Sequence, residues 1–276
     1  MEIRFHNSAR EVRTMTTDEL RSNFLIQSVM QANTISLVYS HYDRMIIGGV
    51  MPVAKMVSLP TYDALKAKFF LERREIGIIN VGGDGEIIVN GKTFALRKLD
   101  CLYIGKGNAK VGFRSKKKDY PAKFYLLSAP AHHAYPTRLL KKEKAMPMEL
   151  GAAATANQRT VYKYIHLAGI KSCQLVMGLT ILKEGSVWNT MPTHVHDRRM
   201  EAYFYFDLPA NQKLIHLMGE PAQTKHLVVG NEEAIISPPW SIHSGCGTSN
   251  YGFIWGMAGE NLDYADMDPV DINQLK

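Results

Sequence analysis

The most informative stretch of this sequence is Met191-Pro-Thr-His-Val-His-Asp-Arg-Arg-Met-Glu-Ala-Tyr-Phe-Tyr-Phe-Asp207. His194 and His196 are two residues apart, so in an extended strand both imidazoles leave the same face. Glu201 lies at an odd offset of five residues from His196, and an unbroken strand would turn its carboxylate to the opposite face. A turn or bulge across residues 197–200, where the sequence is polar, brings that carboxylate back beside the histidines.

A third histidine follows a proline-rich turn in Ile236-Ser-Pro-Pro-Trp-Ser-Ile-His243. A single histidine on a strand is usually a surface or core residue, but this combination of three histidines and a carboxylate rarely arises by chance. Such a set fits zinc, manganese, iron, cobalt or nickel and leaves positions open for substrate or water. The sequence therefore predicts a metal site made of His194, His196, Glu201 and His243.

Short predicted strands with glycine-rich turns recur every eight to twelve residues, which is typical of a β-sandwich or β-barrel. The second series of strands echoes the first: Glu75-Ile-Gly-Ile-Ile-Asn80 parallels Glu201-Ala-Tyr-Phe-Tyr-Phe206, which indicates an internal duplication. No H-x-H precedes Glu75, so the first copy cannot build the same metal site. Alternation after Glu201 predicts Tyr203 and Tyr205 on its side of the strand and Phe204 on the other.

Residues 129–156 lose this rhythm and are typical of a connector. We therefore expect an N-terminal domain at 1–150, which has no metal site and includes the linker, and a C-terminal metal-binding domain at 151–276. The capping box Thr16-Thr-Asp-Glu19 predicts a helix over residues 17–31 that packs outside a sheet.

The composition narrows the class of protein. No apolar leader and no run of 18 uncharged apolar residues occurs, so we expect no membrane insertion. Three widely spaced cysteines favour a reducing cytoplasm over a disulfide scaffold. The net charge of +7 is scattered, its one dense run being Lys116-Lys-Lys118, and no nucleic-acid-binding motif accompanies it. A small anionic substrate is favoured over nucleic acid.

The metal motif, in one of two strand-rich copies, resembles the cupin superfamily. Longer segments are similar to the 5-keto-4-deoxyuronate isomerases, also called 4-deoxy-L-threo-5-hexosulose-uronate ketol-isomerases; among them are Phe70-Leu-Glu-Arg-Arg-Glu-Ile-Gly77, Leu182-Lys-Glu-Gly-Ser-Val-Trp-Asn189 and Ser237-Pro-Pro-Trp-Ser-Ile-His-Ser-Gly245. The resemblance implies an all-β bicupin fold of two jelly-roll barrels with a few peripheral helices. It also implies one zinc ion per subunit on His194, His196, Glu201 and His243, and a homohexamer.

The same resemblance implies a step of bacterial pectin and uronate breakdown, in which 5-dehydro-4-deoxy-D-glucuronate becomes 3-deoxy-D-glycero-2,5-hexodiulosonate. Such an isomerisation needs no redox cofactor, and no dinucleotide or P-loop motif is present. Two rival hypotheses stay open: an iron-dependent cupin dioxygenase, which would consume oxygen, and a non-catalytic sugar-binding cupin.

The sequence leaves several roles open. Candidates for the proton-transferring base are Glu201, Tyr203, Tyr205 and Lys183, each of which is also a plausible packing residue. Arg198 and Arg199 can hold a substrate carboxylate bidentately or serve a solvated or intersubunit role. Trp188, Trp240 and Trp255 either wall the pocket or pack in the core.

Overall fold

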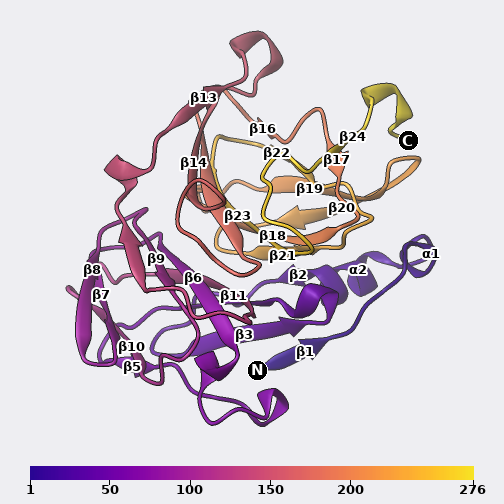
Figure 1. The fold of residues 1–276 in the computed structure, drawn as a ribbon. Coiled ribbons are helices and arrows are strands. Elements are labelled where there is room, and N and C mark those ends of the chain that lie inside the picture. The colour runs from indigo at the N-terminus through magenta and orange to yellow at the C-terminus, as the bar shows by residue number, and fades with distance from the viewer.

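The computed structural model describes residues 1–276, which form short β-strands with a few short helices at the periphery (Figure 1). Each half of the chain contains one seven-stranded and one four-stranded sheet. The prediction of a mainly β, two-barrel cupin architecture is therefore confirmed. None of the helices is long and apolar enough to cross a membrane.

The first half is built around a seven-stranded sheet whose strands, in spatial order, are β1 (Glu2–Arg4), β3 (Ile35–Ser40), β4 (Ile46–Val50), β11 (Phe124–Pro130), β6 (Arg74–Asn80), β9 (Cys101–Ile104) and β12 (Arg138–Leu140). Its four-stranded sheet contains β5 (Val57–Ser58), β10 (Val111–Ser115), β7 (Gly85–Val89) and β8 (Lys92–Leu96). Ile76 and Phe113 belong to one apolar cluster that fills the space between these two sheets.

The second half repeats this plan. Its seven-stranded sheet contains β13 (Met148–Leu150), β14 (Arg159–Ile165), β15 (Val176–Leu182), β23 (Gly252–Gly259), β18 (Arg199–Phe206), β21 (Ala234–Ser237) and β2 (Leu25–Ile26). Its four-stranded sheet contains β16 (Trp188–Asn189), β22 (Ser244–Gly247), β19 (Leu214–Glu220) and β20 (Gln223–Val229), and a separate pair joins β17 (His194–Val195) to β24 (Asp268–Pro269). The matching strand orders agree with an internal duplication.

The first half supplies an edge strand to the seven-stranded sheet of the second half. Strand β2 comes from the first 26 residues yet pairs with β21 of the second half, beside which it lies in Figure 1. The segment predicted as a connector supplies an edge strand to each half, because β12 pairs with β9 and β13 pairs with β14. The division at residue 150 stays a prediction, and these pairings show that main-chain hydrogen bonds link the two halves across it.

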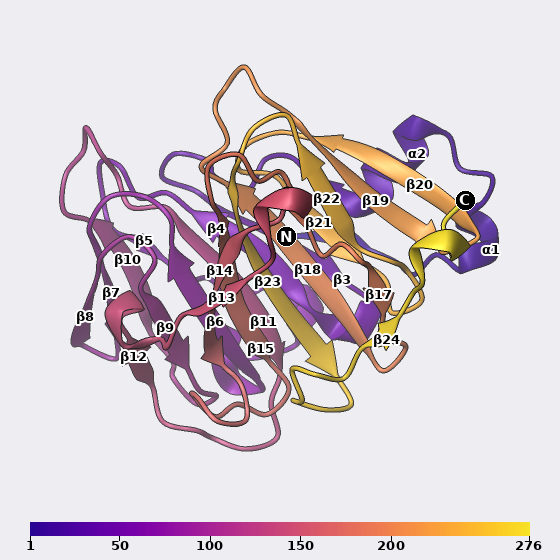
Figure 2. The ribbon, with the colours of Figure 1, turned by 90° about the horizontal axis from the view of Figure 1, so that it is seen from above.

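The helices are short: α1 (Ala9–Val12), α2 (Thr17–Phe24) and the 3-10 helices η1 (Tyr42–Arg44), η2 (Asp63–Leu65), η3 (Phe70–Glu72), η4 (Lys142–Lys144), η5 (Ala153–Thr155) and η6 (Ile272–Gln274). The predicted capping box at Thr16 and Glu19 is present. The helix ends at Phe24 rather than near residue 31, because Leu25 and Ile26 pair with β21 and sheet pairing overrides helix propensity there. Figure 2 shows α2 beside β20, outside the second half's sheet.

The largest apolar cluster lies where the two seven-stranded sheets meet. Tyr125 of β11 stacks on Phe204 of β18 with ring centroids 4.4 Å apart. Two glycines permit this approach: a Cβ on Gly77 would lie 2.7 Å from Ile165 Cδ1, and one on Gly256 would lie 2.2 Å from Leu127 Cδ1. The outer face of β18 is occupied by this apolar packing, so the side chains on its inner face point into the second barrel.

Candidate metal centre and cavity

The four predicted metal ligands converge inside the second half. His194 lies in β17, His196 follows that strand, Glu201 lies in β18, and His243 directly precedes β22. Residues 197 and 198 form a turn, and the Arg199 amide donates to the His196 carbonyl at 3.1 Å. The predicted turn is therefore present, and it places the Glu201 carboxylate beside both imidazoles.

The donor atoms of the four side chains all lie within 4.8 Å of one another. Glu201 Oε2 lies 3.0 Å from His196 Nε2 and 2.9 Å from His243 Nε2. His243 Nε2 also lies 3.0 Å from His194 Nε2. Three imidazole nitrogens and one carboxylate oxygen around a common point form a donor set suited to a first-row divalent ion, so the cluster can bind a metal.

Backbone groups behind the cluster orient two of its imidazoles. His196 Nδ1 lies 3.0 Å from the Arg199 carbonyl oxygen, and His243 Nδ1 lies 3.3 Å from the Ser241 carbonyl oxygen. A carbonyl can only accept, so these contacts favour a proton on Nδ1 and leave the Nε2 lone pair facing the other donor groups. Both rings therefore turn Nε2 towards the other donor groups, as a shared ion would require.

The charge states of Glu201 and His194 suit a cation. Although burial favours the neutral acid, the neighbouring His243 and His196 hold the pKa of Glu201 well below its usual value. Burial, helped by the nearby His243, lowers the pKa of His194 to about 3. Burial opposes protonation of His196 as well, but its contact with Glu201 outweighs that effect and raises its pKa. At neutral pH the cluster thus offers an ionised carboxylate and a neutral His194.

The cluster opens into a cavity of about 370 Å³. The wall is formed by the inner faces of β14, β15, β18 and β23, the edge strand β13, the segment 190–194 and the C-terminal segment; its residues are Met148, Leu150, Arg159, Val161, Thr180, Thr190, Pro192, Thr193, His194, Glu201, Tyr203, Phe253, Trp255, Met257, Tyr264, Met267 and Pro269. Most of this wall is apolar, so polar groups are few and each can direct a ligand.

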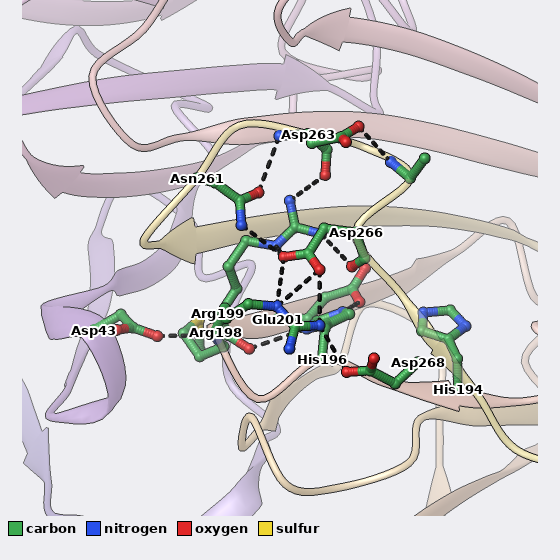
Figure 3. Close-up of polar contacts among 12 residues, drawn as sticks. Asp43, His194, His196, Arg198, Arg199, Glu201, Asn261, Asp263, Asp266 and Asp268 are labelled. Atoms are coloured by element: carbon green, nitrogen blue, oxygen red, sulfur yellow. Dashed lines mark hydrogen bonds and ion pairs between the residues drawn. The ribbon is translucent and has the colours of Figure 1, made fainter.

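Arg198 and Arg199 do not line this cavity. Arg198 forms ion pairs with Asp266 and Asp268, at 2.7 and 2.6 Å. Arg199 is fully buried and donates to the carbonyl oxygen of Asp266 at 2.8 Å, as well as to that of Asp263. Figure 3 shows both guanidinium groups among the residues of this C-terminal loop. The arginines therefore fasten the loop beside the metal cluster, and the prediction that they hold a substrate carboxylate is not supported.

The positions of the remaining base candidates and of the tryptophans show which of them can reach the cavity. Tyr203 lines the cavity, and its hydroxyl lies 3.1 Å from Thr190 Oγ1. Tyr205 faces the same interior but bonds to buried His216 at 2.8 Å. Lys183 pairs with Glu149 at 2.5 Å, outside the cavity wall. Of the three tryptophans, Trp255 alone lines the cavity.

Thr193 and Arg159 are among the polar residues of the wall that the sequence interpretation did not single out. Thr193 is 2% exposed, and its hydroxyl has no hydrogen-bond partner. Arg159 is the first residue of β14 (Arg159–Ile165). Extending the alternation of β14 back to Arg159 would have placed it on the inner face with Val161.

Comparison with known proteins gives a consistent result. The sequence model of the KduI/IolB family matches residues 24–272. A protein of Shouchella clausii named 4-deoxy-L-threo-5-hexosulose-uronate ketol-isomerase is 52% identical over 276 residues, which cover 100% of both chains.

Solved structures support the fold. An IolB-like protein from Salmonella typhimurium has a TM-score of 0.75 at 14% identity and covers 90% of this chain and 97% of its own. Oxalate decarboxylase from Bacillus subtilis, described with Mn(II) centres, has a TM-score of 0.56 at 9% identity over 81% of this chain and 71% of its own. At these identities the likeness shows a shared cupin fold.

Proposed function

Because this chain belongs to the KduI/IolB family, we propose that it is a ketol-isomerase that converts 5-dehydro-4-deoxy-D-glucuronate into 3-deoxy-D-glycero-2,5-hexodiulosonate in uronate breakdown. Full-length relatives that are named ketol-isomerases support the enzyme class. The observation that carries the proposal is the convergence of His194, His196, Glu201 and His243 beside a cavity large enough for a six-carbon sugar acid, which His194 and Glu201 line.

The proposed reaction moves a hydrogen from C2 to C1 of an aldose through an enediol, with no net redox change. We propose zinc as the ion, and a divalent ion held by the four side chains supplies Lewis acidity where negative charge develops on substrate oxygen. The apolar wall, including Phe253 and Met257, limits the access of water to the reacting carbons.

Tyr203 is suited to act on the substrate from the same wall. Burial, together with the neighbouring Glu201 charge, raises the pKa of Tyr203 well above its usual value, so its hydroxyl stays protonated at neutral pH. Thr190 lies within hydrogen-bonding distance of that hydroxyl and orients it. In this proposal Tyr203 donates a hydrogen bond to a substrate oxygen rather than removing a proton from carbon.

The test combines metal analysis with an assay. The purified protein is analysed for bound metals and then incubated with the product of unsaturated-uronate ring opening, in air and under anaerobic conditions. We expect about one zinc ion per chain and equal conversion with and without oxygen. Conversion that consumes oxygen and needs iron would favour a dioxygenase, and metal binding without conversion would favour a non-catalytic sugar-binding cupin.

We also propose a homohexamer that acts in the cytoplasm. The cysteines support this compartment, because Cys101, Cys173 and Cys246 are all free, as a reducing environment favours. Light scattering of the purified protein tests the assembly, since a hexamer has six times the mass of one chain.

A further inference from the structure

The cavity wall contains a single cationic side chain, Arg159, apart from the histidine of the metal cluster. Glu201 is the only carboxylate in the wall, and its oxygen is engaged by His196 and His243. The rest of the wall is apolar or carries neutral hydroxyl groups. An anionic ligand in this cavity therefore has one fixed positive partner besides a bound metal.

Most of the N–H donors of the Arg159 guanidinium group have no partner within the chain. Its Nη1 donates to the Asn157 carbonyl oxygen at 2.8 Å, and it forms no ion pair with any aspartate or glutamate of the chain. A guanidinium group has five N–H donors, so most of those of Arg159 are free. By contrast, Arg198 beside the same cluster is paired with Asp266 and Asp268.

An unpaired, half-buried cation is costly unless a ligand neutralises it. Burial lowers the pKa of Arg159, in keeping with a charge that is partly removed from water. The residue also starts a strand held on both sides, since it pairs with Leu150 of β13 and Leu182 of β15. The fold thus keeps a charged group at a defined place without giving it an internal counter-ion.

One short segment connects Arg159 to the metal cluster. Asn157, which accepts from Arg159, donates through its Nδ2 to the Met191 carbonyl oxygen at 3.4 Å. The adjoining residues Thr190, Thr193 and His194 line the cavity. Arg159 and the metal cluster are therefore held by the same wall segment, so that one ligand can contact both.

We propose that Arg159 binds the carboxylate of the acidic sugar and thereby selects uronates over neutral sugars. This inference rests on the proposed function, because it assumes that the cavity takes a sugar acid. The planar guanidinium group matches a carboxylate through two parallel hydrogen bonds, which lysine cannot reproduce. The carboxylate end of the sugar then lies at Arg159 and its reacting end at the metal cluster.

The test compares Arg159→Gln and Arg159→Lys with Arg138→Gln, a matched control on an exposed arginine that begins β12. All are prepared with metal, and metal content and thermal unfolding are checked first. We expect Arg159→Gln to raise KM for the uronate about 10- to 100-fold with kcat changed little, as loss of hydrogen bonds to a charged group predicts. Arg159→Lys should give a smaller rise, and Arg138→Gln none.

Equilibrium binding of a simpler sugar acid gives a readout that does not depend on turnover of the proposed substrate. D-glucuronate and D-glucose are titrated against the metal-loaded protein while tryptophan fluorescence is followed, since Trp255 lines the cavity. We expect wild type to bind D-glucuronate more tightly than D-glucose and Arg159→Gln to lose that preference.

The outcomes separate the two proposals. If wild type converts the uronate but Arg159→Gln keeps its KM and its preference for D-glucuronate, the inference about Arg159 is wrong and the proposed function stands. If wild type converts no uronate but prefers D-glucuronate to D-glucose, and Arg159→Gln abolishes that preference, the inference stands and the proposed function is wrong. A fall in kcat at unchanged KM would also overturn the carboxylate-binding role.

Discussion

Glu75 and Glu201 lie on corresponding strands of the two halves, but their side chains point to opposite faces. Glu201 pairs with Ser237 across β18 and β21 and faces the interior of its barrel. On the equivalent ladder of the first half, Ile76 pairs with Ile104 and faces the interior, so Glu75 faces outwards to the other half. The predicted alignment of Glu75 with Glu201 is therefore wrong by one residue, which inverts the face of a strand.

The outward-facing Glu75 ties the two halves together, and its removal should destabilise the protein. Its carboxylate is fully buried and accepts from the Tyr103 hydroxyl at 2.7 Å and from three successive amides, those of Cys173, Gln174 and Leu175, at 2.7 to 2.9 Å. Glu75→Ala leaves four donors unpaired, two of them buried and two partly buried, which should cost about 3 kcal/mol or more. Denaturant unfolding measures this loss.

The control for Glu75 is Glu143→Ala, which changes an exposed glutamate of η4. We expect this control to unfold at the same denaturant concentration as wild type. Glu75→Ala should keep its metal content at denaturant concentrations where it is still folded. If Glu75→Ala is as stable as wild type, Glu75 does not anchor the interface between the two halves.

This pair of glutamates shows what sequence patterns can and cannot establish about the fold. Strand rhythm and turn residues predicted the class and the duplication, because both depend on local spacing. The Asn90-Gly91 hairpin is an example: both residues have positive φ, 48° and 86°, as a tight hairpin turn requires. Both faces of β6 are buried, and which of them points into the barrel depends on its pairing with β9 and β11, which is a long-range property.

Replacement of a cluster histidine should remove both metal and turnover. His196→Ala deletes one nitrogen donor and the contact with Glu201. We expect metal affinity and activity to fall by more than the roughly 100-fold that loss of an outer hydrogen-bond partner can cause. His226→Ala, on the exposed side of β20, is the matched control and should keep both. Elemental analysis and the isomerase assay measure the two effects, and full activity in a metal-free His196→Ala protein would contradict the proposal.

The loop held by Arg198 and Arg199 should control how firmly the metal cluster is kept. Asp266→Ala removes the carboxylate that binds Arg198 and leaves all four cluster residues unchanged. Because Arg199 accepts from His196 through its carbonyl oxygen, loosening this region should speed metal release to a chelator several-fold, up to about 10-fold. Asp119→Ala, in an exposed loop, serves as the control; equal release rates in both variants would exclude a role for the loop.

The candidate site was predictable where a local pattern marks its residues, as the proline-rich turn marks His243. His194, His196 and Glu201 were found because one strand, one turn and the next strand fix their relation. Arg159 was missed because it precedes the cluster by 35 residues and reaches the cavity only once β14 pairs with β15. Arg198 and Arg199 looked suitable for a carboxylate, but their partners Asp263, Asp266 and Asp268 come from a C-terminal loop that carries no local signal.

The stability of the metal-free protein should fall in mild acid because of His216. This side chain is fully buried, bonds to the Tyr205 hydroxyl through Nδ1, and has no partner for Nε2. Burial lowers the pKa of His216 to about 3, well below the usual value of about 6.5 for an unfolded chain. Between these values the unfolded state binds a proton that the folded state does not, so stability is lost as pH falls from about 6.5 towards 3.

His216→Asn isolates this contribution, because asparagine can keep the bond to Tyr205 but cannot titrate. Denaturant unfolding of the metal-free proteins is followed in steps from pH 7 to pH 4. The slope of the unfolding free energy against pH should be shallower in the variant by up to about 1.4 kcal/mol per pH unit, the value for one proton. The same slope in both proteins would mean that His216 takes up its proton in the folded state, which its buried, unpartnered Nε2 disfavours.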